Sequence, residues 1–561
     1  MYCMFRHGKG VAPNMQGWMA ACVIACAVVG CLTPEKAERD AEKTARELAT
    51  AYWKAQTGVT NDFVITRPAD ALTLKIALEA VRQGVTNAIF PKIAGVSPLA
   101  PGSNGFVRLS LSDALALGAR NNRRYQTLKE DVYLKALSLD TQRYEFDTKF
   151  TGFLLGALAG EPEIYRNSVE AGAGAGRRFE NGASIAGNLA VDVVRMLRDD
   201  WHSTGLTGDL TVTVPLLRGA GRDIVREPLT QAERDLVYSL LTFSRYRQTY
   251  MLTVAKAYYN VLEYAQNRRN SDDNARRLEQ NWDRAEMMFK AGRMDRIQVD
   301  QAKTDLLTAR QTIITTQQRY EDALDSFKMT LGMVPEAPVA LRDEELAKLE
   351  AEMAACATNQ PHALADFPDE ATALNTALVS RSDLAVVRGD VVDCERAVGV
   401  AADALKADVT LEGGGSIDEE RRQHRPYGGN ESTFARLRIN FPWDRRRERN
   451  AYRKSLIALE RSRRTFEESE DEVKNEVRAG YRNLVAARAL YENKVESLKT
   501  AQMRVDSNDL FMQSGRSSMR DILEAESAML TARNALCSAV ISWRISDLSL
   551  RTAMGTLEVN F

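Results

Sequence analysis

Two acidic residues near the C-terminal end of the chain are spaced so that their charges can act together. Asp521 and Glu524 follow Gly515 by six and nine residues, so a helix that starts after this glycine would carry both carboxylates on one face. Copies of that face around a narrow opening would attract cations and repel anions. The structural alternative is that both acidic residues are simply first-turn residues, which the helix dipole favours, and the two interpretations are compatible.

Histidine and cysteine, the other residue types that often carry chemistry, form no recognisable site. The four histidines are far apart in the sequence, and the seven cysteines show no CxxC spacing. A zinc site, a disulfide framework and a histidine-based catalytic cluster are therefore not indicated. We expect no bound metal, no cofactor and no enzymatic activity.

The composition narrows the class of protein. The 561 residues carry 75 basic and 76 acidic side chains, and this balance lacks the basic excess that would indicate a nucleic-acid partner. Charged residues make up 27% of the chain and the mean hydropathy is −0.33, so the bulk of the chain is too polar for an α-helical membrane protein. A chain of this length can bury a sizeable core.

The N-terminal segment is typical of a secretory signal. Basic residues precede an apolar run over residues 18–29, which is too short to span a bilayer comfortably as a helix. Cys31 follows the small residue Gly30, and this arrangement resembles a lipobox, in which the cysteine is acylated and becomes the mature N-terminus. The alternative is an ordinary signal peptide with an incidental cysteine, or a wrongly assigned start.

The elements that would position the acidic pair come from a duplication. Residues 257–262 resemble residues 479–484, and the tetrapeptide Leu-Thr-Ala-Arg occurs at both 307–310 and 530–533, an offset of about 222–223 residues. Solenoid repeats have periods of only about 20–50 residues, so this offset indicates a duplicated half-protein. Each half carries a helix, a pair of strands and two very long helices in the same order.

The strands are indicated by alternation with a period of two residues. Apolar residues alternate with polar or charged ones over 210–214, 407–412 and 435–441. The first half has a further strand over about 145–156, whereas strand and loop are not distinguished over 157–205. A soluble sandwich and a membrane barrel with a water-filled lumen both need this alternation, so the pattern leaves both open.

The long helices are the most unusual elements. Residues of about 226–290 and 444–513 are rich in Ala, Glu, Arg and Leu and almost free of Pro and Gly. At about 1.5 Å per residue, such helices span on the order of 100 Å. Helices this long occur in coiled coils, membrane spans or helical tubes, and these are too charged to be spans. A break at Gly292 or Gly515 would return the chain along a second helix.

The predicted strands require several chains if they cross a membrane. Four strands per chain cannot close a barrel, and an open edge in lipid leaves backbone groups without hydrogen bonds, at a cost of several kcal/mol each. Three chains would pool twelve strands, an even number within the range of known membrane barrels. The same threefold arrangement would pack the long helices into a tube.

With this combination of elements the chain resembles the TolC-like family of outer-membrane efflux and export channels. The resemblance covers about residues 108–561 and rests on the duplication and on the strand-to-helix junction at 213–219. It rests most on residues 515–525, with the sequence Gly-Arg-Ser-Ser-Met-Arg-Asp-Ile-Leu-Glu-Ala.

The resemblance implies a fold and a set of partners. Members of the family are trimers, so the expected fold class is an α+β membrane protein with a 12-stranded β-barrel in the outer membrane and an α-helical tunnel in the periplasm. Energy would come from an inner-membrane pump, proton-driven or of the ABC type, coupled through a periplasmic adaptor protein. The chain would be the passive exit duct of a tripartite efflux or type I secretion system, in contact with outer-membrane lipid and with no nucleic acid.

The N-terminal signal and the duplication together predict how the chain is divided into segments. The expected segments are a signal peptide at 1–30, an N-terminal periplasmic segment at 31–105, a first repeat at 106–337, an inter-repeat linker at 338–370 and a second repeat at 371–561.

The resemblance assigns the acidic residues to a pore constriction at the closed periplasmic end. Asp521 and Glu524 match the family's acidic ring. In the first repeat the matching position is Gln298, with Asp295 and Asp300 displaced nearby. Three copies of each carboxylate would surround the opening.

The periplasmic tip also departs from the family's pattern. The tip turns would be formed by a glycine and an arginine in each repeat, Gly292 with Arg293 and Gly515 with Arg516. The family's gating arginine corresponds here to Ser517 and its aromatic latch to Met512. The resemblance therefore implies that the closed state is locked by other contacts.

A periplasmic coiled-coil adaptor or scaffold is the main rival from another class, because such proteins also carry long helical hairpins. Adaptors usually have one hairpin and compact β domains. Two hairpins and two amphipathic strand pairs favour the channel.

Overall fold

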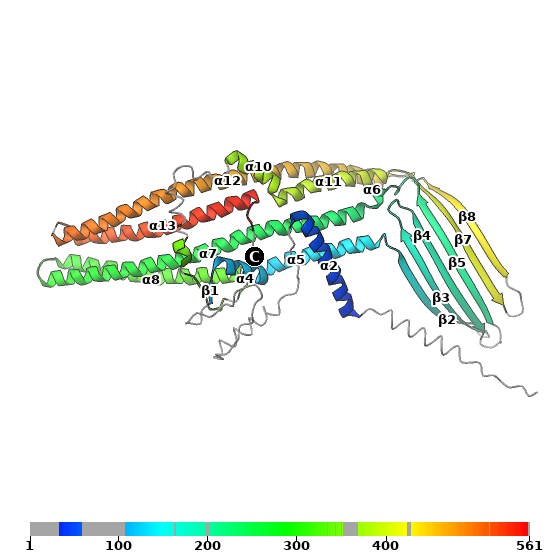
Figure 1. Ribbon diagram of the computed structural model, residues 1–561, viewed down its shortest axis with the longest axis horizontal. Helices are drawn as coiled ribbons and strands as arrows, with labels where there is room; N and C mark the ends of the chain where they lie inside the picture. Colours follow the sequence, from blue (N-terminus) through cyan, green and yellow to red (C-terminus); the bar gives the residue numbers. More distant parts are fainter. Residues whose placement is uncertain are drawn as a thin grey trace, which may run out of the picture.

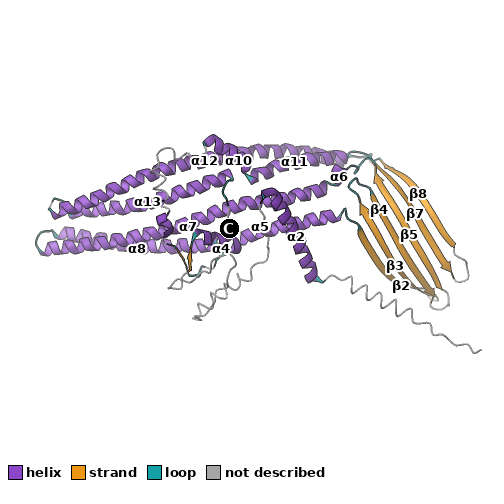
Figure 2. Cartoon of the chain, viewed as in Figure 1, coloured by secondary structure: helices purple, strands orange, loops and turns teal. Residues whose placement is uncertain are grey.

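The computed structural model describes residues 33–58, 107–161, 164–196, 202–333, 335–342, 344–348, 351, 369–422, 428–441, 443–514 and 516–558. The molecule is elongated, with long helices at one end and one large sheet at the other (Figure 1). Colouring by secondary structure shows the same separation along the long axis (Figure 2). The predicted signal peptide, Cys31 and Gly515 lie outside the described residues.

The described helices follow the duplication. The N-terminal helix α2 spans Pro34–Thr57 and precedes both repeats. The helices of the first repeat are α4 (Leu111–Asn121), α5 (Arg123–Tyr144), α6 (Arg222–Val225), α7 (Glu227–Lys290) and α8 (Arg296–Thr330). Those of the second repeat are α10 (Glu370–Ser380), α11 (Ser382–Asp403), α12 (Arg446–Gln513) and α13 (Met519–Met554). The two predicted long helices are confirmed, since α7 has 64 residues and α12 has 68.

In each repeat, a glycine at the end of the second long hairpin helix packs against the break between the first two helices of the same repeat. Gly332 follows α8 and Gly555 follows α13, and both have positive φ angles of 72° and 73°. Gly332 packs on the break between α4 and α5, where an added Cβ would come within 2.5 Å of the Asn121 carbonyl oxygen. Gly555 packs on the break between α10 and α11, where a Cβ would lie 3.1 Å from the Ser380 oxygen. Glycine is needed at both positions, so the duplication extends to the ends of the hairpins.

One antiparallel sheet contains six strands in the order of the sequence. The strands are β2 (Lys149–Glu161), β3 (Ile164–Arg178), β4 (Ser184–Met196), β5 (His202–Pro215), β7 (Asp408–Arg422) and β8 (Gly428–Asn440). A separate parallel pair joins β1 (Val107–Leu109) to β6 (Val339–Leu341). The outer strands of the large sheet, β2 and β8, each have a neighbour on one side only in the described chain, so the sheet is open.

The expectation of four strands per chain is wrong, because the large sheet of the described chain has six. The first repeat contributes four strands and the second contributes two. The additional hairpin, β3–β4, lies in the region where strand and loop were not distinguished from the sequence. Along β3, alanine alternates with glycine over residues 171–176, so the alternation is nearly invisible on a hydrophobicity scale.

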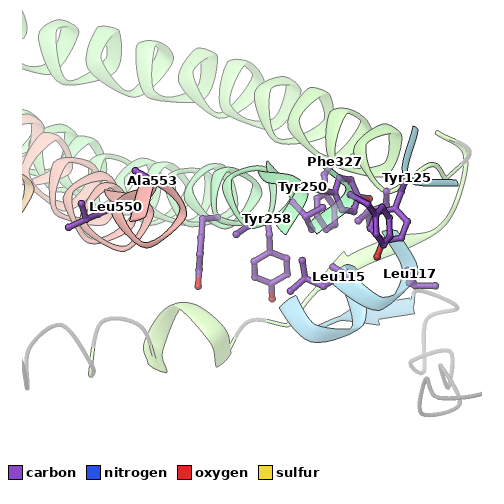
Figure 3. Close-up of a cluster of buried hydrophobic side chains, with 14 of the residues drawn as sticks. Leu115, Leu117, Tyr125, Tyr250, Tyr258, Phe327, Leu550 and Ala553 are labelled. Carbon is purple, nitrogen blue, oxygen red and sulfur yellow. The ribbon is translucent and has the colours of Figure 1, made fainter. Parts of the chain in front are cut away.

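The main core lies where helices of both repeats meet the β1–β6 pair (Figure 3). The ring centroids of Tyr125 and Tyr250 are 5.7 Å apart, and those of Tyr258 and Phe327 are 5.9 Å apart. The fully buried Tyr258 donates its hydroxyl to the carbonyl oxygen of Leu109 on β1, at 3.4 Å. This core holds the hairpins and the sheet at opposite ends of the molecule.

Candidate functional site

The tips of the two helical hairpins are built by the same turn. The amide of Arg293 donates to the carbonyl oxygen of Met288 at 2.9 Å, and the amide of Arg516 donates to that of Phe511 at 2.8 Å. Gly292 has a φ angle of 70°, which favours glycine at this bend. A tight turn thus joins α7 to α8, and the turn between α12 and α13 is described on both sides of Gly515, whereas the assignment of these turns to the periplasmic tip stays a prediction.

Asp521 caps the start of α13. Its Oδ2 accepts hydrogen bonds from the Ser518 hydroxyl at 2.6 Å and from the Ser518 amide at 2.9 Å, while the Asp521 amide donates to the Ser518 hydroxyl at 3.3 Å. This is a capping box. The hydrogen bonds from Ser518 hold the pKa of the exposed Asp521 carboxyl below its ordinary value. The structural alternative for Asp521 thus holds, and the charge stays in solvent.

The other predicted acidic residues are also exposed, and two of them form ion pairs within their own hairpin. Glu524 pairs with Arg504 of α12 at 2.8 Å, and Asp300 pairs with Arg296 of α8 at 3.1 Å. Asp295 occupies the N-cap position of α8, with no side-chain cap hydrogen bond. Among the described residues, no group of three or more His, Cys, Asp and Glu side chains is placed to hold a metal ion. Any ring that these carboxylates form needs further copies of the chain.

The two hairpins are tied together by polar contacts that the sequence did not reveal. Arg277 of α7 pairs with Glu526 of α13 at 2.7 Å, and the Glu526 side chain is only 6% exposed. Arg284 of α7 pairs with Asp509 of α12 at 2.6 Å. No local sequence signal marks these pairs, because their members lie more than 200 residues apart in the chain.

The positions where the chain departs from the family's pattern contribute to this tip in other ways. Met512 is buried in a second apolar cluster that also contains Met519 and Val299, from both hairpins. The Ser517 hydroxyl lies 3.5 Å from Oδ2 of Asp521 and so supports the cap. Apolar packing and capping therefore occupy the positions that correspond to the family's aromatic latch and gating arginine.

The large sheet has two chemically different faces. Residues that are directly opposite in the register share a face, so the faces can be followed from β2 to β8. One face carries apolar residues in all six strands, namely Phe150, Leu154, Val169, Ala171, Ala173, Ile185, Leu189, Val191, Leu210, Val212, Val214, Val409, Leu411, Ile417, Leu437 and Ile439. Charged residues on this face lie toward the strand ends, with Arg177 at the helix end of β3 and Glu419 and Glu431 in the halves of β7 and β8 that lie away from the helices. The other face carries Glu170, Asn188, Asp192, Asp209, Thr211, Thr213, Thr410, Glu412, Ser416, Asp418, Arg436 and Arg438.

The apolar face is uncovered. Phe150 is 80% exposed, and Leu189 and Leu437 are each 56% exposed. On β5 the apolar positions run from Leu206 to Val214, nine residues, close to the 9–11 that a tilted strand needs to cross a bilayer. Among the residues that the structure describes, no second layer of helices or strands covers this face (Figures 1 and 2). An apolar surface of this extent requires lipid or another chain.

The polar face carries paired charges and two aromatic side chains. Glu412 accepts from Arg438 at 3.0 Å across the β7–β8 pair. Phe153 on β2 faces Gly172 on β3, and Phe434 on β8 faces Gly414 on β7. An added Cβ would come within 2.4 Å of the Phe153 ring at Gly172 and within 3.0 Å of the Phe434 ring at Gly414. Each outer strand thus lays an aromatic ring over a glycine of its neighbour, which pins the register.

None of the helices in the described ranges combines the length and apolarity needed to cross a membrane.

Comparisons with known proteins agree with this geometry. The model of a family described as outer membrane efflux protein matches residues 197–332 and 373–556, more than half of the chain. No curated protein matches the chain.

Solved structures with the same fold are bacterial outer membrane channels. The CmeC outer membrane channel of Campylobacter jejuni is 14% identical with a TM-score of 0.56, over 84% of this chain and 94% of that chain. The outer membrane protein VceC of Vibrio cholerae is 12% identical with a TM-score of 0.55, over 79% and 96%. The MtrE outer membrane channel of Neisseria gonorrhoeae, in its open state, is 12% identical with a TM-score of 0.55, over 80% and 90%.

Proposed function

Because this chain belongs to the outer membrane efflux protein family, we propose that it is the passive exit duct of a tripartite efflux or type I secretion system. The resemblance to TolC-like channels is confirmed. The protein belongs to the outer membrane and extends from it into the periplasm. In the proposed role it has no catalytic activity and needs no cofactor. Substrates are handed over by an inner-membrane pump, proton-driven or ABC, through a periplasmic adaptor.

The open, two-faced sheet is the observation that carries this proposal. Its uncovered apolar face suits lipid, its polar face suits water, and its two unpaired edges need partners of the same kind. A homotrimer meets all three needs, since β8 of one protomer can pair with β2 of the next until the sheet closes. Outer-membrane lipid is then the solvent for the apolar face.

The hairpin tips form the constriction in this proposal. Three copies of Asp521 and Glu524, with Asp295 and Asp300 of the first repeat, line the narrow periplasmic end and favour cations. All four carboxylates are solvent-exposed and lie within one or two helical turns of the tips. The tip residues Gly292, Arg293, Gly515 and Arg516 face the adaptor.

Cys31 provides a lipid anchor in the same proposal. Acylation at this position would hold the N-terminus at the outer membrane. The Cys31→Ser variant is expected to lose incorporation of labelled fatty acid while the strands still insert. Unchanged labelling in the variant would rule the anchor out.

Assembly is the sharpest test of the duct. We expect a trimer that is extracted only with detergent and that dissociates on heating in dodecyl sulfate. In planar bilayers the trimer should conduct ions. A monodisperse monomer purified without detergent would overturn the duct and favour an adaptor or scaffold.

A further inference from the structure

We propose that three chains close a barrel of eighteen strands. The exit through the outer membrane is then wider than that of a twelve-stranded barrel, to which each chain would contribute four strands. This inference rests on the proposed trimeric duct. The observation behind it is the hairpin β3–β4 within the first repeat, which has no counterpart in the second repeat.

The hairpin belongs to the sheet and is not a flap attached to its end. β3 pairs with β2 over 13 residues and with β4 over 13, and β4 pairs with β5 over 12. These ladders are as long as the β5–β7 ladder of 13 pairs, which joins the two repeats. The hairpin therefore lies within the sheet, between β2 on one side and β5 on the other.

The two faces of the hairpin continue those of its neighbours. On the apolar face, Leu154 of β2, Ala171 of β3, Val191 of β4 and Leu206 of β5 follow one another in the register. On the polar face, Glu170 of β3 is directly opposite Asp192 of β4. A hairpin folded outside the barrel would have no reason to match both faces, so the alternation supports lipid on one side and water on the other.

The added strands enlarge the lumen. With neighbouring strands about 4.8 Å apart and tilted by about 40°, a closed barrel of eighteen strands is about 36 Å across between backbones, against about 24 Å for twelve. The diameter grows in proportion to the strand number, so the cross-section grows about twofold.

The inner surface of β3 leaves this space open. Its polar face carries glycine at three successive inward positions, Gly172, Gly174 and Gly176. These positions send no side chain into the lumen, although the Phe153 ring lies over Gly172 and the Thr151 and Asn188 side chains lie over Gly174. The barrel is therefore suited to bulky hydrated solutes that a twelve-stranded exit would exclude.

Electron cryomicroscopy of the detergent-solubilised trimer tests the strand number without any variant. We expect eighteen strands in a cross-section through the barrel. A closed trimeric barrel with twelve strands, and β3–β4 folded outside it, would overturn this inference and leave the duct intact. Absence of a trimer would instead overturn the proposed function.

A deletion variant tests the consequence for width. β2 and β5 run antiparallel to each other, so removing residues 164–196 lets them pair directly, with Leu154 and Leu206 still on one face. Neutral polymers of graded size, added to planar bilayers from the barrel side, should enter the wild-type barrel up to a radius about 1.5 times the limit in the deletion variant. If the wild-type channel and the deletion variant both assemble and admit polymers up to the same radius, the exit is not widened by the hairpin.

Single cysteines keep the inference testable if the deletion variant does not assemble. In a background without the native free cysteines, Asn188→Cys on β4 should react with a membrane-impermeant thiol reagent, whereas Leu189→Cys should be protected in lipid. Asp209→Cys and Leu210→Cys on β5 serve as the matched pair on a strand that both arrangements place in the barrel. Equal reactivity of the two β4 positions, with normal alternation on β5, would place the hairpin outside the barrel.

Discussion

At the scale of single residues, the carboxylate of Asp521 is both a helix cap and an exposed charge. Hydrogen bonds from Ser518 hold its pKa below the ordinary value of 3.8. Since the folded-state pKa is depressed, the cap stabilises the start of α13 fully above the ordinary value, and this contribution is lost as the pH falls through the lower folded value. The same bonds keep the charge at the tip over that range.

This shift predicts the pH dependence of ion selectivity. In a channel that carries Glu524→Ala, Asp295→Ala and Asp300→Ala, the selectivity that remains from Asp521 should persist as the pH falls to about 4 and should be lost only below the ordinary pKa of the carboxyl. Adding Ser518→Ala removes the cap and should move this loss to higher pH. Reversal potentials in planar bilayers with a salt gradient measure both. If selectivity is lost at the same pH with and without Ser518→Ala, the hydrogen bonds from Ser518 do not set the pKa of Asp521 in the channel.

Part of this site could be predicted from the sequence. The spacing of Asp521 and Glu524 after a glycine was enough to place both near the start of a helix and in solvent. Their partners could not be predicted, since Arg504 reaches Glu524 from the opposite arm of the hairpin. The pair formed by Arg277 and Glu526 depends on how two hairpins pack, and packing leaves no local pattern in a single sequence.

At the scale of elements, the hairpins are coupled by the pair between Arg277 and Glu526. Nε of Arg277 donates to Glu526, whose side chain is almost completely buried. A charge-assisted hydrogen bond at such a site contributes about 1.5–3 kcal/mol, and removing one partner leaves the other poorly solvated. This ion pair therefore holds α13 against α7 on the side of the tip that leads toward the sheet.

Glu526→Ala should loosen the tip without disturbing the barrel. Hydrogen exchange at the amides of α13 near Glu526 should accelerate by about tenfold to a hundredfold, which corresponds to about 1.4–2.7 kcal/mol. Glu279→Ala is the matched control, because Glu279 pairs with Arg310 at 2.9 Å but both side chains are about half exposed. Equal protection in Glu526→Ala and Glu279→Ala would show that the buried pair does not couple the hairpins.

The strands show a second coupling, between an aromatic ring and a glycine. Gly172→Ala brings a methyl group into the Phe153 ring and should lower the temperature at which the trimer dissociates, by overpacking worth about 1–3 kcal/mol. Removing the ring as well, in Gly172→Ala with Phe153→Ala, should recover part of the loss. Gly156→Ala is the control, because nothing lies within 4 Å of its added Cβ. No recovery in the double variant would mean that the ring is not the obstacle.

The elements were predicted unevenly from the sequence, for physical reasons. The long helices were located within a few residues, because charged and apolar side chains repeat over many turns without proline or glycine. β5, β7 and β8 were recognised at their ends near the helices, where large apolar residues alternate with polar ones. β3 was missed because alanine and glycine differ little in hydrophobicity, although their alternation does separate the two faces of that strand.

At the scale of the whole molecule, insertion depends on the apolar face of the sheet. Leu210 lies at the middle of the nine-residue apolar stretch of β5, and Thr211 next to it points to the polar face. An arginine at the lipid-facing midplane of a barrel costs about 2–4 kcal/mol, whereas lumen-facing positions tolerate charge.

Leu210→Arg should therefore reduce the amount of heat-labile trimer in outer-membrane fractions, and Thr211→Arg should not. Electrophoresis without heating measures the trimer, and total chain in the same fractions corrects for expression. Because three chains each carry the substitution, the cost is applied three times per barrel. Comparable trimer yields from both variants would show that the assigned faces are reversed or that the sheet does not meet lipid.

The apolar cluster that the tips of the two hairpins share limits how the chain can change in length during evolution. At about 1.5 Å per residue, removing seven residues from α12 alone would draw its end back by about 10 Å and pull Met519 away from Val299 in the apolar cluster at the tip. Insertions and deletions should therefore be retained only when all four arms, α7, α8, α12 and α13, change together by whole turns. Homologues of different length would then reach into the periplasm by distances that differ in steps of whole helical turns. The adaptors that contact their tips would have to change in length by the same steps.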